Sequence, residues 1–304
     1  MAIVRIGKSL PSRSRFVLPL VVVASCVAAE PAAPLRVEAH ARAIAPGEPV
    51  RILVVSPEPL SSAKATLLGA EVPLVRLPPA APSPETWCGF GVIDLDRKPG
   101  AAAIEVRGTT ADGRTLAGAL AVTIEAKSFP EQRLKVDDKF VRPPPSARER
   151  IERESKLLGG IYATRTERVP PAAPFVRPVP GEPSSPYGSR RVFNGVPKSP
   201  HSGLDLRAAS GDPVEAAGAG TVRLTRDLYY SGNTVILDHG AGLFTVYAHL
   251  SRILVHEGDE VAAGAKVGLV GATGRVTGPH LHWGAKAGDR PFDPSALLDP
   301  GLFR

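Results

Sequence analysis

Four of the seven histidines in this 304-residue chain fall in three short stretches after residue 200. The stretch PHSGLDLRA places His201 four residues before Asp205, VYAHLS carries His249, and TGPHLHWGAK carries His280 and His282. Imidazole and carboxylate groups are the ligands that a hydrolytic zinc ion uses, with three protein ligands and one position for water. Such an ion lowers the pKa of its water and polarises a scissile carbonyl group. These five side chains are therefore candidates for a metal-dependent hydrolytic site.

The spacing of the two histidines in TGPHLHWGAK predicts the direction of their side chains. His280 and His282 are two residues apart in a segment typical of a strand, so their side chains point to the same face. A metal hydrolase also needs a group that takes and returns a proton, and histidine suits this near neutral pH. Residue types and spacing leave open which three of the five bind a metal. The alternative, unrelated core or turn histidines, is disfavoured because each of the five lies beside a glycine or in a strand.

Three motifs together resemble the lysostaphin/LytM-type zinc metallopeptidases of bacterial cell walls. The motifs are HSGLD, YAHL and GATGRVTGPHLHWG, and the resemblance covers roughly residues 175–300. It implies a duplicated-hybrid-motif-like β fold and one zinc ion in the catalytic domain. The implied function is an exported zinc metalloendopeptidase that cuts peptide cross-links or stem peptides of peptidoglycan. The resemblance does not say which bond is cut.

The resemblance also divides the five residues by position. It implies that His201, Asp205 and His282 bind the zinc, and that His249 and His280 stay off the metal. One of these two histidines would act as general base on the attacking water, and the other would stabilise the oxyanion or protonate the leaving amine. Which histidine takes which role stays open.

Two other functions match parts of the sequence less well. A catalytically silent LytM-type module that binds and activates another cell-wall hydrolase would lack one or more of the five residues, and this chain has all of them. A lipoyl- or biotinyl-type carrier is suggested by EGDEVAAGAKVGLVG, but Lys266 lacks the setting of a modified lysine. The carrier interpretation also leaves the histidines unexplained.

The approach to the first motif, YGSRRVFNG, supplies four candidate substrate-binding residues: Tyr187, Arg190, Arg191 and Asn194. An arginine there could pair with a carboxylate of a wall peptide, although a surface role fits equally well. The proline-rich segment 170–186 lies just before the catalytic domain, and this position raises the hypothesis of an inhibitory plug.

A mainly β architecture must position these residues. Residues 175–300 predict an antiparallel, barrel-like β domain, and residues 35–126 predict a small immunoglobulin-like β-sandwich. Between them, residues 127–174 predict a linker with one helix at about 146–160. Ser146 and Glu149 have the spacing of a capping box at the start of that helix.

Residues 1–29 predict an export signal, with basic residues followed by the apolar run 16–23 and small residues. The signal has two candidate ends: cleavage after VAA, or the lipobox-like VASC, which would limit it to 1–25 and place a lipid on Cys26. That lipid is the only membrane attachment expected, because the apolar run is shorter than the ~20 residues of a spanning helix. Both ends predict a periplasmic or cell-envelope location.

The formal net charge is +7, but residues 1–25 hold four basic and no acidic residues, so their removal leaves +3. Nucleic-acid binding is therefore not expected. Loss or lipidation of Cys26 leaves Cys88 as the one remaining cysteine, which predicts a small buried apolar residue and no disulfide.

Overall fold

The computed structural model describes residues 34–78, 84–166 and 168–304. The predicted export signal and Cys26 lie outside the described residues. The described residues form a mainly β chain, as the sequence predicts, with two α-helices rather than the one expected and two short 3-10 helices. None of these helices has the length and apolar character needed to cross a membrane.

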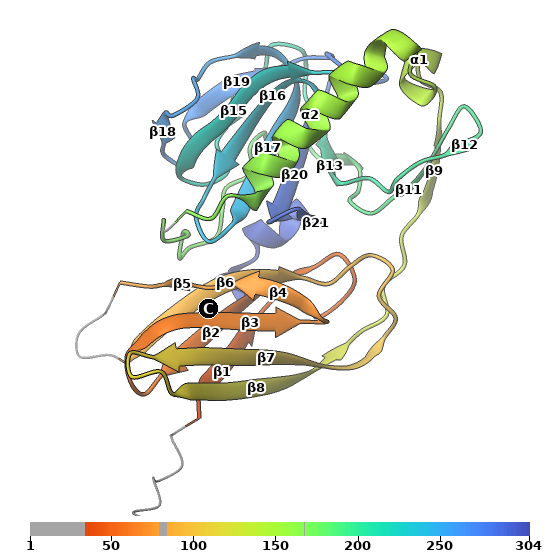
Figure 1. Ribbon diagram of the computed structural model, residues 1–304. Helices are drawn as coiled ribbons and strands as arrows, with labels where there is room; N and C mark the ends of the chain where they lie inside the picture. Colours follow the sequence, from red (N-terminus) through yellow and green to blue (C-terminus); the bar gives the residue numbers. More distant parts are fainter. Residues whose placement is uncertain (1–33, 79–83, 167) are drawn as a thin grey trace, which may run out of the picture. The chain divides into compact units, whose positions relative to one another are not determined.

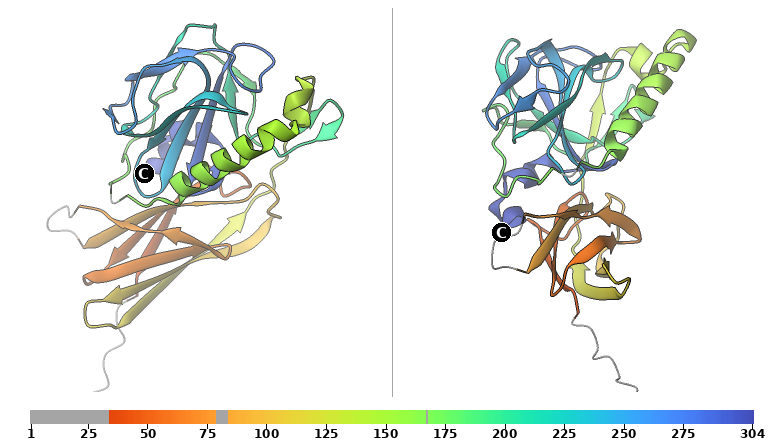
Figure 2. Two further views of the ribbon diagram at one scale, coloured as in Figure 1. Left: turned by 45° about the horizontal axis from the view of Figure 1, so that its top comes forward. Right: turned by 60° about the vertical axis from the view of Figure 1, so that its left-hand side comes forward.

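The N-terminal strands, red-orange to yellow in Figure 2, build two antiparallel sheets. The strand orders are β1-β2-β6-β5 and β4-β3-β7-β8. Buried side chains from both sheets, among them Ile52, Leu67 and Ile104, form one apolar cluster. The Asp112-Gly113 turn joins β7 to β8, with Gly113 at φ +85°. Cys88 is buried and free, as expected. The sandwich is described, whereas the immunoglobulin-like outline stays a prediction. The strands are β1 Arg36–His40, β2 Pro49–Ser56, β3 Leu60–Leu67, β4 Ala70–Pro73, β5 Val75–Arg76, β6 Glu85–Val92, β7 Gly100–Thr110 and β8 Thr115–Ile124.

Three elements follow before the large sheet: β9 (Glu131–Leu134), α1 (Asp138–Val141) and α2 (Pro145–Ala163). Helix α2 lies along one face of the large sheet (Figure 1), where Tyr162 packs edge-on against Phe244 of β17 at a centroid distance of 5.5 Å. Burial of this apolar side, rather than helix propensity alone, holds a helix that contains two adjacent glycines.

The capping-box prediction for α2 is wrong. The helix begins at Pro145 with Pro144 as N-cap, so Ser146 lies inside the first turn and no side chain caps the N-terminus. Proline at the first helical position needs no hydrogen-bond partner and has the helical φ already, which explains why the helix starts one residue earlier. The helix also continues through Gly159 and Gly160 to Ala163.

The C-terminal part of the chain forms a ten-stranded sheet whose main path is β10-β13-β20-β17-β16-β15-β18. Its interior is apolar and includes Trp283, Tyr247 and Phe292, which are fully buried. The elements are β10 Pro183–Ser185, β11 Arg190–Phe193, β12 Val196–Pro197, β13 Gly203–Leu206, β14 Pro213–Glu215, β15 Gly220–Leu228, β16 Gly232–Asp238, β17 Leu243–Ile253, β18 Glu260–Val261, β19 Lys266–Val270, β20 Leu281–Ala287, β21 Arg290–Phe292, η1 Pro294–Leu298 and η2 Pro300–Phe303.

A separate three-stranded sheet has the order β12-β11-β9, with β9 parallel to β11. Its hairpin turns at Asn194-Gly195, and both residues have positive φ, which asparagine and glycine tolerate best. The segment 131–134, which the sequence predicts as linker, is therefore a strand that joins the C-terminal part of the molecule.

Candidate metal centre

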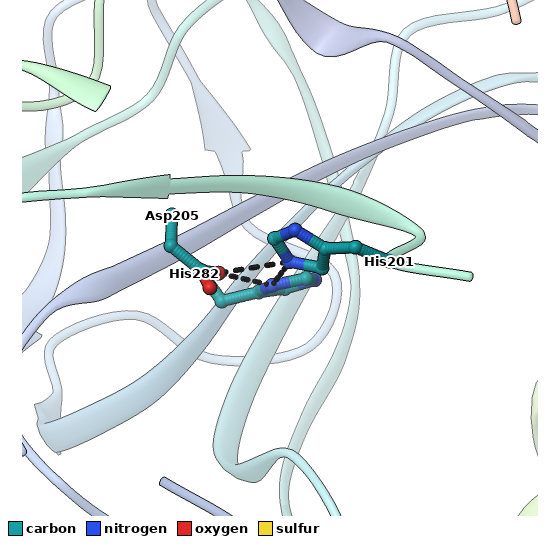
Figure 3. A group of neighbouring side chains, drawn as sticks. All are labelled: His201, Asp205 and His282. Carbon is teal, nitrogen blue, oxygen red and sulfur yellow. Dashed lines mark hydrogen bonds and ion pairs between the residues drawn. The ribbon is translucent and has the colours of Figure 1, made fainter. Parts of the chain in front are cut away.

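Two neighbouring antiparallel strands, β13 and β20, bring three donor atoms together. Asp205 of β13 lies directly opposite His282 of β20 in the sheet register, and His201 precedes β13 by two residues. His201 Nε2 and His282 Nδ1 lie 3.0 Å apart, and each is 2.9 Å from Asp205 Oδ1 (Figure 3). The three side chains converge on one point although 81 residues separate the first from the last.

Gly203 makes room for this convergence. A Cβ atom added at Gly203 would lie 2.6 Å from His282 Cε1 and 2.6 Å from the carbonyl oxygen of Trp283. The glycine in HSGLD therefore lets the His282 ring pass over β13 to reach Asp205.

The donor set fits a divalent cation. His201 Nδ1 is 3.1 Å from the carbonyl oxygen of Pro186, which only accepts hydrogen bonds, so Nδ1 carries the proton and Nε2 presents a lone pair. This lone pair faces a second imidazole nitrogen and a carboxylate oxygen, an arrangement that a bound cation satisfies. Tetrahedral ligands at ~2.0–2.1 Å from a zinc ion lie about 3.3 Å from one another, close to the separations found here. The carbonyl behind His201 is the outer partner that metal-binding histidines usually have.

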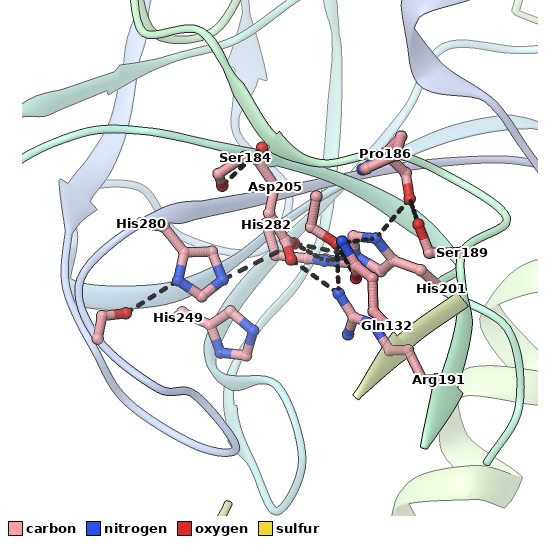
Figure 4. Close-up of polar contacts among 12 residues, drawn as sticks. Gln132, Ser184, Pro186, Ser189, Arg191, His201, Asp205, His249, His280 and His282 are labelled. Carbon is pink, nitrogen blue, oxygen red and sulfur yellow. Dashed lines mark hydrogen bonds and ion pairs between the residues drawn. The ribbon is translucent and has the colours of Figure 1, made fainter. Parts of the chain in front are cut away.

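Arg191 supports the carboxylate from behind. Its Nη2 donates to Asp205 Oδ2 over 2.8 Å and to Ser185 Oγ over 3.0 Å (Figure 4). Burial alone would raise the pKa of Asp205, but its close contacts with the His201 and His282 rings outweigh burial and hold that pKa well below its usual range. Burial lowers the pKa of Arg191, and the Asp205 carboxylate opposes this shift. Asp205 is therefore an anion with one oxygen held and the other directed at the histidines.

The other two histidines lie beside this group (Figure 4). The His249 ring is 5.1 Å from the His280 ring and 5.8 Å from the His282 ring, measured between centroids. His280 Nε2 is 3.7 Å from Asp205 Oδ1, so His280 and His282 approach the same carboxylate. The structure thus brings all five candidate residues into one cluster.

Carbonyl partners fix the proton on each outer ring. His249 Nδ1 is 2.8 Å from the carbonyl oxygen of Thr273, and His280 Nδ1 is 2.9 Å from that of Gly278. Each Nδ1 must therefore donate, which leaves each neutral ring with a lone pair on Nε2. Burial, followed by the charges of His282 and His280, lowers the pKa of His249 to about 3. Burial likewise lowers the pKa of His201 to about 4.

His249 owes its direction to an irregularity in β17. The pairing of β16 with β17 shifts register between Asn233 and Val235, and His249 lies at this bulge with φ +64°. A positive φ costs a residue with a side chain about 1 kcal/mol or more and recurs at functional sites. The bulge directs the side chain of His249 toward the cluster.

Two cavities adjoin the five-residue cluster. The Asp205-side cavity, of about 610 Å³, includes Asp205, His280 and Gln132 in its wall. The His249-side cavity, of about 460 Å³, includes His201, His249, His282, Phe140 and Arg275. The five residues therefore lie between two open spaces that could hold the two sides of an extended peptide.

Only one of the four candidate substrate-binding residues lines either of these two cavities. Arg191 lines the His249-side cavity. The described residues that line the two cavities do not include Tyr187, Arg190 or Asn194. The buried Tyr187 hydroxyl donates to the carbonyl oxygen of Pro291, Arg190 is exposed, and Asn194 bonds to the backbone of Val136 at its turn.

The cavity walls also include Arg275, Gln132 and Phe140, which are not among the site residues that the sequence predicts. Arg275 lies inside the GATGRVTGPHLHWG motif, so the sequence contained a signal for it. Gln132 and Phe140 come from the segment predicted as linker, where nothing in residue type or spacing points to a site. Segment 170–186 contributes only Ser184 and Ser185 to the Asp205-side cavity, as part of the edge strand β10.

Comparison with known proteins gives one family. The sequence model of peptidase family M23 matches residues 199–294, which include all five clustered residues. A crystal structure from Pseudomonas aeruginosa, described as a candidate peptidase M23, is 32% identical, covers 85% of this chain and 96% of that chain, and has a TM-score of 0.62.

Curated relatives match over a shorter region. The peptidoglycan DD-endopeptidase ShyA of Vibrio cholerae is 44% identical over 111 residues, which are 36% of this chain and 26% of ShyA. The DD-carboxypeptidase/endopeptidase Mpg of Neisseria meningitidis is 40% identical over 100 residues, which are 33% of this chain and 23% of Mpg. The matched region thus spans about a quarter of the length of these relatives.

Proposed function

Because this chain belongs to peptidase family M23, we propose that it is an exported zinc metalloendopeptidase that cleaves peptide cross-links or stem peptides of bacterial peptidoglycan. The observation that carries the proposal is the convergence of His201, Asp205 and His282 within about 3 Å of one another. Two further histidines with free Nε2 lone pairs lie beside them. Relatives with a matching region are named peptidoglycan DD-endopeptidases, which supports the substrate class and a place of action in the cell envelope.

Zinc is the proposed ion because two imidazoles and one carboxylate leave a tetrahedral position open for water. When bound, zinc supplies a water of lowered pKa and polarises the scissile carbonyl group. His201 Nε2, His282 Nδ1 and Asp205 Oδ1 would hold the ion. Arg191 holds the second oxygen of Asp205, so that the carboxylate keeps one orientation.

His249 and His280 are the proposed catalytic residues. In its neutral form each ring has its lone pair on Nε2, so each is able to accept a proton from the attacking water. The ring that has accepted a proton then becomes a donor to the oxyanion or to the leaving amine. Their Nδ1 atoms, held by the Thr273 and Gly278 carbonyl groups, keep both rings in this orientation.

The alternative, a silent module that activates another hydrolase, has less support because all five residues are present and converge. The carrier interpretation has even less support, because Lys266 begins strand β19 rather than lying at a hairpin tip. Export through residues 1–29, with or without a lipid on Cys26, remains part of the proposal.

The proposed function is tested on the full chain with purified peptidoglycan. We expect about one zinc ion per chain, release of soluble fragments, and loss of release on addition of a chelator. Mass spectrometry of the fragments identifies the bond cut. Full activity of His201→Ala would show that the metal assignment is wrong. Full zinc content without cleavage of any peptide bond would favour the silent module.

A further inference from the structure

Arg275 extends its guanidinium into the wall of the His249-side cavity, between two aromatic rings. Its Cζ lies 4.9 Å from the Phe193 ring centroid and 4.8 Å from the Tyr230 ring centroid. Rings on both sides favour the cation and restrict its movement. The edge that carries the N–H groups is left available for a ligand.

The loop that carries Arg275 is fixed by backbone contacts. The Arg275 amide donates to the Tyr230 carbonyl oxygen over 2.8 Å. Gly274 has φ +73°, and a Cβ there would lie 2.4 Å from the Gly232 nitrogen and 2.7 Å from the Tyr230 carbonyl oxygen. Two loops therefore meet at a distance that only glycine allows. The guanidinium is positioned before any substrate arrives.

Within the described ranges, no hydrogen bond or ion pair links the Arg275 side chain to an acidic residue. The charged group that acts on it is a second cation: burial lowers the pKa of Arg275, and repulsion by Arg191 lowers it further. The other cations of this wall have partners, since Arg191 pairs with Asp205 and Lys198 Nζ donates to the Val141 carbonyl oxygen. The cavity thus offers one guanidinium whose charge is not neutralised, in the same wall as His201, His249 and His282.

We propose that Arg275 binds a free carboxylate of the peptide substrate in the His249-side cavity and thereby selects peptides that carry this carboxylate next to the cleaved bond. This inference rests on the proposed function and adds the substrate chemistry. A planar guanidinium matches a carboxylate through two parallel hydrogen bonds. A low-dielectric wall with a second guanidinium nearby strengthens the attraction for an anion and disfavours a neutral carboxamide.

The test uses the zinc-loaded full chain and a synthetic D-alanyl–diaminopimelate cross-linked peptide, prepared with its free carboxylates amidated one at a time. We expect amidation of one particular carboxylate to raise the wild-type KM about tenfold or more, with little change in kcat. Arg275→Gln should raise KM similarly for the free acid and abolish the difference between acid and amide. Arg275→Lys should retain part of the preference, because it keeps the charge without the planar fork.

Arg226→Gln is the matched control, since Arg226 is exposed on β15 and outside the wall of the cavity. It should keep the wild-type preference, and all variants should keep their zinc. The proposal is overturned if no amidation affects the wild type, or if Arg275→Gln raises KM equally for acid and amide. If the wild type cleaves none of the peptides, the proposed function fails by itself. Calorimetric affinities of the same peptides then decide the role of Arg275, and equal Kd values for acid and amide would refute it.

Discussion

Arg191 and Asp205 form an ion pair in which the two oxygens of the carboxylate have different partners. Arg191 Nη2 lies 2.8 Å from Asp205 Oδ2, whereas Asp205 Oδ1 faces His201 and His282 at 2.9 Å each. The pair is mostly buried, with 14% and 10% of the two side chains exposed. A buried pair of this kind costs desolvation free energy, so its benefit lies in orientation rather than in stability.

Replacement of Arg191 should therefore weaken metal binding. We expect Arg191→Met to lower zinc affinity roughly 10- to 100-fold, the usual effect of losing an outer partner of a metal ligand. Competition with a chromophoric chelator measures this directly. The neighbouring exposed Arg190 provides the control, because Arg190→Met should leave zinc affinity unchanged. Equal affinities for both variants would contradict a positioning role for Arg191.

Variants of His280 and His282 should separate metal binding from turnover. We expect His282→Ala to lose zinc, since it removes one of three ligands, and His280→Ala to keep zinc while kcat falls at least about 100-fold. Zinc content by atomic emission and cleavage of peptidoglycan on the same samples give both numbers. Equal loss of zinc in the two variants would refute this division.

Gly203 should be needed for metal binding although it carries no ligand atom. The Cβ of Gly203→Ala would lie 2.6 Å from both the His282 ring and the Trp283 carbonyl oxygen, so His282 must move. We expect a clear fall in zinc affinity. Gly159→Ala, in α2 with no atom within 4 Å of its added Cβ, should keep zinc and stabilise the chain by about 1 kcal/mol. A Gly203→Ala variant with normal zinc affinity would show that the close contact is relieved elsewhere.

His239 should make stability depend on pH without touching the site. It is fully buried between the Ala219 carbonyl oxygen and Thr245 Oγ1, and burial lowers its pKa from 6.5 to about 4. Below pH 6.5 the unfolded chain takes up a proton that the folded chain does not, so stability is lost as the pH falls from about 6.5 to about 4. This loss is on the order of 3 kcal/mol for a shift of that size.

Urea denaturation between pH 7 and pH 4 measures this loss. His239→Gln should show a shallower pH dependence, whereas His256→Gln should match the wild type because the His256 side chain is 91% exposed. The same slope for His239→Gln as for the wild type would exclude His239 as the cause.

The sequence predicts those features that depend on short stretches. Alternating burial in β7 and the Asp112-Gly113 turn follow from local patterns, and so does the presence of one long helix. The sequence places the start of α2 wrongly because Ser146 and Glu149 match a capping box, whereas Pro145 favours the first helical position more strongly. The β fold of the C-terminal part follows from its strands, but the pairing of β9 with β11 depends on residues 59 apart.

The candidate site likewise has residues that the sequence predicts and contacts that it does not predict. Motif residues could be named because histidine, aspartate and glycine are informative at fixed spacing. The hydrogen-bond partners of Tyr187 and Asn194 cannot be predicted from the sequence. A tyrosine beside a cleft and a tyrosine bonded to a buried carbonyl group have the same sequence pattern. Asn194 followed by Gly195 is a pair typical of tight turns, and both residues have positive φ.

The wall contributed by Gln132 and Phe140 has a consequence for how this protein could diverge. These residues lie on β9 and α1, outside the residues 199–294 that define the family match. The stretch from β9 to α1 could therefore be exchanged as a unit, changing these walls while His201, Asp205 and His282 stay the same. Part of the cavity walls is thus encoded outside the segment that carries the five clustered residues, and the two segments are free to change independently.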